Sequence, residues 1–153
     1  MKKNSFLNLV MSFQTKQIFG YLGAIPFITL SILPWISSNL AETSLRASSM
    51  YGAIILSFLG GMVWGWKKAK TFDLFIGILL SVLAILIIFF SFEYIFMSNI
   101  LCFISFAGFY FFEMQRNPMF LNPPEYAELR LILTLLVTIC YFMNIAFIFN
   151  PYT

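Results

Sequence analysis

The chain has 153 residues, of which 61% are hydrophobic and 10% are charged. Because soluble domains are roughly 45–50% apolar and about 25% charged, this composition excludes an ordinary soluble domain and indicates a membrane protein. The net charge is +3, but the basic residues lie beside hydrophobic segments instead of along one stripe, so no nucleic-acid partner is expected.

Residues 1–17 are predicted to form an interfacial segment ahead of the first membrane span. In a helix, Phe6, Val10 and Phe13 would share one face, with Lys2 and Lys16 among the flanking basic residues. This pattern is typical of a helix that lies at the membrane surface. A mobile polar leader is the alternative.

A bilayer core about 30 Å thick needs roughly 20 mostly apolar residues in a helix. Five stretches meet this requirement, at residues 18–37, 48–66, 72–91, 94–112 and 129–149. Pro26 and Pro34 lie in the first, where neighbouring helices can satisfy the freed carbonyls, so we expect a kinked helix. Residues 38–47 are expected to be a polar loop that could form a surface helical turn, and residues 113–128 the longest loop. The third and fourth spans are expected to meet in a tight hairpin at Phe92 and Glu93. The sequence therefore predicts one domain, residues 1–153, that is an all-α, polytopic integral membrane bundle of five transmembrane helices.

The basic residues predict how this bundle is oriented, because lysine and arginine concentrate in cytoplasmic loops. One side of the membrane would carry Lys2, Lys3, Lys16, Lys67, Lys68, Lys70, Arg116 and Arg130, and the other only Arg46. We therefore expect a cytoplasmic N-terminus and a C-terminus on the outside. The expected location is a bacterial inner (plasma) membrane, with the mitochondrial inner membrane as the alternative.

The second span carries small residues at every fourth position, which predicts a face for close helix packing. These residues are Ser49, Ala53, Ser57, Gly61 and Gly65. In lipid, small side chains let two backbones approach each other and gain dispersion contacts. The leading interpretation is packing inside the chain with this helix at the centre, so that Gly61→Leu would force helices apart. The face could instead join two copies of the chain, or form a groove for a lipid or a partner helix.

Shorter patches in other spans could match this face. They are Gly20 and Ala24 in the first span, and Gly77 and Ser81 in the third, while Gly52 and Gly60 widen the groove on the second span itself.

Polar residues of the fifth span could line a groove. They are Thr134, Thr138, Tyr141 and Asn144. Such side chains usually hydrogen-bond between helices, so an internal packing role stands beside a role in binding a solute.

No ionisable residue lies deep in any predicted span, and the sequence has no histidine. Buried ionisable groups mark ion pathways and proton relays, and histidine is a ligand in many zinc and haem sites. We therefore expect no catalytic residue, no cofactor and no metal site. Charged residues gather near the long inner loop, at Glu113, Arg116, Glu125, Glu128 and Arg130. They could hold headgroups or a partner's basic segment, although a solvated face of weak ion pairs is the commoner outcome.

Residues 51–61 (YGAIILSFLGG), with Trp64 and Gly65, resemble the hallmark of the bacterial family called domain of unknown function 3429, which includes the eukaryotic transmembrane protein 69. Residues 20–27 resemble its first helix, and Pro124, Tyr126, Leu129, Arg130 and Thr134 resemble the start of its last. Members often carry a basic residue or histidine where this chain has Met62 and Val63. The resemblance implies a multi-helix inner-membrane protein of bacterial or mitochondrial type, and no assigned activity.

Together these features predict a non-enzymatic protein that packs against other membrane helices. It would be an accessory or assembly subunit of a larger inner-membrane complex, such as a respiratory one. Its partners would be membrane lipids, together with helices of other proteins or further copies of itself. The alternative is a small transporter or channel for a neutral or lipidic solute, active as an oligomer.

Overall fold

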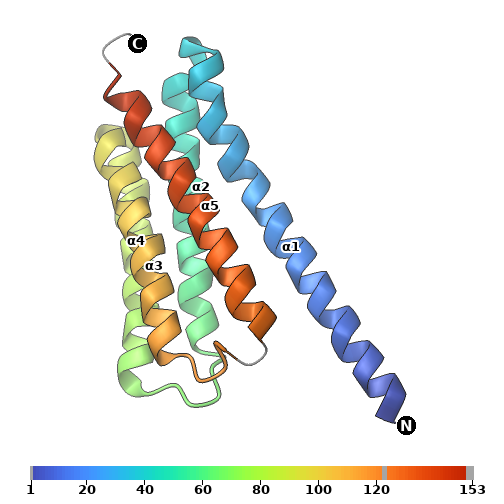
Figure 1. The fold of residues 1–153 in the computed structure, drawn as a ribbon. Helices are drawn as coiled ribbons and strands as arrows, with labels where there is room; N and C mark the ends of the chain where they lie inside the picture. The colour runs from blue at the N-terminus through green and yellow to red at the C-terminus, as the bar shows by residue number, and fades with distance from the viewer. Residues whose placement is uncertain (1, 122–123, 151–153) are drawn as a thin grey trace.

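The computed structural model describes residues 2–121 and 124–150, with side chains described for Thr15 and from Gln17 onward within those ranges. The described residues form five α-helices and one short 3₁₀ turn. In chain order these are α1 (Lys2–Ile36), η1 (Ser38–Leu40), α2 (Ala41–Val63), α3 (Thr71–Glu93), α4 (Ile95–Arg116) and α5 (Pro124–Ile148). Figure 1 shows one bundle, with α1 at its edge and leaning away from it toward the N-terminus.

Each α-helix contains a stretch long and apolar enough to cross a membrane. These stretches are Gln17–Ile36, Ser38–Val63 (which includes η1), Thr71–Glu93, Ile95–Arg116 and Pro124–Ile148. The predicted all-α bundle with five membrane-spanning helices is therefore confirmed. The direction in which the bundle crosses the membrane stays a prediction.

The second helix begins earlier than the sequence predicted. Residues 38–47, expected as a polar loop, form η1 and the first turns of α2. Ala41 and Leu45 are buried against Phe147 of α5, and Arg46 pairs with Glu42 one turn earlier, at 2.7 Å. The polar residues between them therefore belong to a helix whose apolar positions pack on the bundle.

The long loop before the last helix is shorter than predicted at both of its ends. α4 continues to Arg116, and α5 begins at Pro124, where proline is well suited because the first helical turn needs no amide donor. The connection between α3 and α4 is the tight hairpin expected there, since only Tyr94 lies between the two helices.

The N-terminal region is continuous with the first span. α1 runs without interruption from Lys2 through Pro26 and Pro34 to Ile36. The side chains of Phe6, Val10 and Phe13, which carried the predicted interfacial face, lie outside the described residues.

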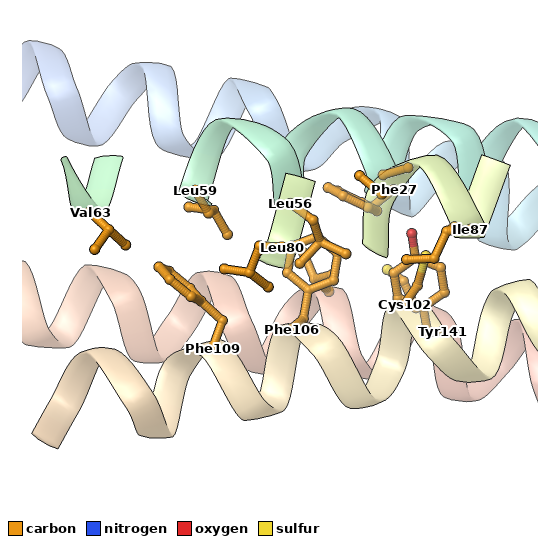
Figure 2. Packing of buried hydrophobic residues seen from close by; sticks show 14 residues of the cluster. Phe27, Leu56, Leu59, Val63, Leu80, Ile87, Cys102, Phe106, Phe109 and Tyr141 are labelled. Carbon is orange, nitrogen blue, oxygen red and sulfur yellow. The ribbon is translucent and has the colours of Figure 1, made fainter. Parts of the chain in front are cut away.

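An apolar core fills the middle of the bundle and draws on every helix. Its members include Phe27 of α1, Leu56 of α2, Ile87 of α3, Phe106 of α4 and Tyr141 of α5, all at most 5% exposed. Figure 2 shows these side chains converging between the helices. The rings of Phe106 and Tyr141 stack at 6.0 Å between centroids, with Phe27 edge-on to both. In lipid, such contacts stabilise the bundle mainly through dispersion, because the surrounding tails are as apolar as the side chains.

The two ends of the bundle differ in charge. The α2–α3 and α4–α5 connections lie at the same end as the N-terminus (Figure 1). That end carries Lys67, Lys68 and Lys70 after α2, and Arg116 at the end of α4. We call it the basic end. η1, the α3–α4 hairpin and the C-terminal end of α5 lie at the opposite end.

Candidate functional site

Only part of the predicted small-residue face of α2 lies inside the chain. Ser49 and Ala53 are fully buried and Ser57 is half-buried, whereas Gly61 and Gly65 are exposed. A Cβ at Gly61 would meet no heavy atom within 4 Å. An α-helix has about 3.6 residues per turn, so residues spaced four apart are offset by roughly 40° around the helix axis. A row of residues with this spacing therefore does not stay on one face of the helix. The expectation that Gly61 and Gly65 pack inside the chain, and that Gly61→Leu would separate its helices, is therefore wrong.

Two other glycines of α2 make the close contacts instead. A Cβ at Gly60 would lie 2.5 Å from the backbone oxygen of Gly77 on α3, and one at Gly77 would lie 2.7 Å from the oxygen of Gly60. A Cβ at Gly52 would overlap the hydroxyl oxygen of Tyr141. Close approach of α2 to α3 and α5 thus depends on Gly52 and Gly60, which lie next to the predicted face.

Hydrogen bonds confirm that α2 is at the centre of the bundle, because its side chains bond to each of the other helices. The bonds run from Tyr51 to the Gly23 carbonyl of α1 (2.9 Å), between Ser57 and Ser81 of α3 (3.4 Å), between Ser49 and Ser98 of α4 (2.9 Å), and from Asn144 of α5 to Ser48 (3.0 Å).

The polar residues predicted to share one groove on α5 divide between two places. Tyr141 and Asn144 are fully buried and face α2 and α4. The hydroxyl of Thr138 donates to carbonyls of its own helix, at Thr134 and Leu135. Thr134 lines a cleft nearer the basic end. A single polar groove made of all four residues is therefore not formed.

The first polar site is a buried network of Ser48, Asn99, Tyr141 and Asn144, which we call the amide cluster. The Asn144 amide donates to Ser48 Oγ at 3.0 Å and to Asn99 Oδ1 at 3.1 Å, and the Tyr141 hydroxyl donates to the Ser48 carbonyl at 2.9 Å. Asn144 Oδ1 is buried and accepts no hydrogen bond from the described residues. The cluster fixes the register of α2, α4 and α5 toward the end opposite the basic one.

The second site is an ion pair near the basic end. Arg130 of α5 donates from Nε to Glu113 Oε2 of α4 at 2.6 Å, and the Tyr126 hydroxyl donates to Glu113 Oε1 at 2.5 Å. Glu113 is 0% exposed and Arg130 is 9% exposed, with its guanidinium over the ring of Phe109. The commoner reading of the inner-loop charges, a solvated face, is wrong for this pair because α4 and α5 extend past their predicted ends and bury it between them.

A matching pair joins two other helices at the same end. Arg116 Nε of α4 lies 2.8 Å from Asp73 Oδ1 in the first turn of α3, and Asp73 is 2% exposed. Its other oxygen accepts the backbone amide of Lys70 at 2.8 Å. Both pairs join residues of opposite charge at the basic ends of two consecutive helices. This arrangement of charges is visible in the sequence and could have predicted both pairs.

A cleft of about 610 Å³ opens between α1, α2 and α5. Apolar side chains from the three helices form most of its wall, including Phe19, Phe58 and Leu133. Tyr126, Arg130 and Thr134 supply polar groups on its α5 side. The cleft therefore combines apolar walls with Arg130 and Tyr126, the two residues that bond to Glu113.

Residues 13–146 match the family model described as "Protein of unknown function (DUF3429)". The chain belongs to the DUF3429 family. Neither the search of curated proteins nor that of solved structures finds a match to it.

Segments that carried the resemblance to the family contribute to the helix contacts, the ion pair and the cleft of this DUF3429 protein. In the α2 segment, Gly52 and Gly60 make the close contacts and Tyr51 bonds to α1. At the start of α5, Tyr126 and Arg130 complete the buried ion pair and line the cleft. Met62 of the same α2 helix also lines the cleft.

The cleft and the amide cluster of this DUF3429 protein both offer groups suited to binding. The cleft offers apolar surface and guanidinium donors at one end, and the amide cluster offers fixed amide and hydroxyl groups inside the bundle. Among the described residues, no group of three or more His, Cys, Asp or Glu could hold a metal ion.

Proposed function

We propose that this DUF3429 protein is a non-enzymatic accessory or assembly subunit of a larger inner-membrane complex, such as a respiratory one. It would bind other membrane proteins through the outward faces of its helices, with the basic end in the cytoplasm. A bacterial inner membrane is the proposed location.

The main observation is that buried polar groups join the helices of the chain to one another, while the outward faces of those helices carry large apolar side chains. The amide cluster and the two ion pairs join helices to one another. Between them the apolar core is packed with large side chains such as Phe27, Phe106 and Tyr141. A polar solute would have to cross this packed core, so the surface facing the membrane is the better candidate for activity.

We place the proposed docking of a partner helix at Gly61, in the α2 segment that resembles the family hallmark. It is exposed on the outward side of α2, near Phe58, which is 65% exposed. A helix that approaches a glycine can bring the two backbones into close contact and gain dispersion energy. The exposed glycine within an apolar face therefore supports docking of a second protein there.

The test compares two glycine-to-leucine variants in their native membrane. Gly61→Leu adds bulk to the proposed docking face, and Gly108→Leu adds the same bulk on α4, where a Cβ would also meet nothing within 4 Å. Both variants should fold as well as the original protein. We expect tagged Gly61→Leu to lose its co-purifying membrane protein while Gly108→Leu retains it. Equal retention would contradict docking at Gly61.

The second candidate is a small transporter for a neutral or lipidic solute, and the lateral cleft favours it. Gly23 lines the cleft, so Gly23→Leu would obstruct it. Flux of such a solute in proteoliposomes would support this function if it disappears in Gly23→Leu and persists in Gly108→Leu. Liposomes in which the original protein moves no lipid or neutral solute would count against it.

A further inference from the structure

We propose that the cleft between α1, α2 and α5 binds one phospholipid, with an acyl chain against its apolar wall and the phosphate on Arg130. This concerns the occupant of the cleft and holds whether the chain is an accessory subunit or a transporter.

Arg130 has hydrogen-bond donors left over for a ligand. A guanidinium carries five N–H groups, and the Nε–H of Arg130 donates to Glu113. Its Nη groups donate to no other described residue, although the side chain is only 11% exposed and lines the cleft. An arginine held in one orientation by a carboxylate, with free Nη donors, is suited to a phosphate oxygen.

The cleft runs along α5 over part of one leaflet. From Arg130 to Val137 its lining covers a length of about 10 Å at a rise of about 1.5 Å per residue. Half of a bilayer core of about 30 Å is about 15 Å, so the part of an acyl chain nearest its headgroup would lie in the cleft. Arg130 and Tyr126 lie at the end nearer the α4–α5 connection, and Phe27 and Val137 lie toward the middle of the bundle. The polar side chains of the cleft thus lie where the headgroup of a bound lipid would be, and the apolar side chains lie where the lipid's acyl chain would extend.

The wall itself has room for a chain. A Cβ added at Gly23, which lines the cleft, would meet nothing nearer than the Tyr51 hydroxyl at 4.0 Å. The volume of about 610 Å³ falls in the range of roughly 300–1,000 Å³ typical of small-molecule sites. Gly23→Leu would therefore place a bulky side chain in the cleft without moving the backbone around it.

The test uses two lipids with the same acyl chains, one with a phosphate and one without. Delipidated protein in mild detergent is titrated with phosphatidylglycerol and with the matched diacylglycerol, and bound lipid is counted by native mass spectrometry. We expect one phosphatidylglycerol per chain, bound about tenfold or more tightly than diacylglycerol because charge-assisted hydrogen bonds are strong. Equal binding of the two lipids would overturn the role of Arg130, and no saturable binding would overturn the site.

Two variants locate the lipid on the protein. Gly23→Leu should abolish saturable binding of both lipids, while the matched control Gly108→Leu should bind as the original does. The double variant Glu113→Gln/Arg130→Gln keeps a neutral pair in place, so it should still fold, as judged by thermal unfolding, and lose the preference for phosphatidylglycerol. Gly23→Leu protein that binds phosphatidylglycerol normally would overturn the assignment to this cleft, even if the double variant is too unstable to purify.

Discussion

The contact between Gly60 and Gly77 predicts opposite effects for alanine at two adjacent positions of α2. In Gly60→Ala, the new methyl would lie 2.5 Å from the backbone oxygen of Gly77. In Gly61→Ala, it would meet nothing within 4 Å. The two variants share the same change in side chain and the same helix, so they differ only in the contact with α3.

The magnitude follows from the geometry. Alanine is favoured over glycine in a helix by about 0.8–1.0 kcal/mol, a gain common to both variants. Overpacking typically costs about 1–3 kcal/mol. Here the neighbouring atom is backbone, so α3 must move away by about 1 Å, and contacts along the interface lose a quarter to a half of their dispersion energy. We expect Gly60→Ala to be less stable than Gly61→Ala by about 1–3 kcal/mol.

The assay is unfolding of each purified variant by increasing denaturing detergent, followed by circular dichroism. Gly61→Ala should unfold at or above the midpoint of the original protein, and Gly60→Ala below it. Equal midpoints for the two variants would refute the close backbone contact between α2 and α3.

Three further outcomes can be measured in the same assay. Arg130→Ala removes one partner of the buried ion pair and should lower the free energy of unfolding by about 3–5 kcal/mol, because Glu113 would keep an unpaired buried charge. If Arg130→Ala lost less stability than the double variant Glu113→Gln/Arg130→Gln, the result would contradict this reasoning. Asn144→Leu should lower the free energy of unfolding by about 1–3 kcal/mol, because Ser48 and Asn99 in the amide cluster would lose their hydrogen-bond donor. Unchanged stability would mean that these two side chains form hydrogen bonds with water instead. Gly52→Ala should be destabilised by overlap with the Tyr141 hydroxyl and partly rescued by Tyr141→Phe, which removes that oxygen; additive losses in the double variant would contradict the contact.

The number and character of the helices could be predicted from the sequence because hydropathy is a local property. Five apolar stretches of sufficient length predicted five spans, and the short link at Phe92 and Glu93 predicted a hairpin, which the structure has at Tyr94 between α3 and α4. Helix ends were harder, since residues 38–47 are polar in composition and yet helical. There, burial of Ala41 and Leu45 against α5 decides the outcome, and those contacts are not local.

The candidate sites could be predicted only in part, for geometric reasons. Small residues on α2 correctly indicated close packing. A row of residues spaced four apart rotates around the helix, however, so the close contacts are made by Gly52 and Gly60, and Gly61 is exposed. The partners of Tyr141 and Asn144 lie on α2 and α4, far away in the chain, and no pattern within α5 specifies them.

The most direct test of the proposed accessory role is native mass spectrometry of the tagged protein, purified from its own membrane in a mild detergent. We expect a stoichiometric complex that contains at least one different membrane protein, whose peptides would then identify the process. A monomer, or an oligomer made of this chain alone, would contradict the accessory role and direct attention to solute flux.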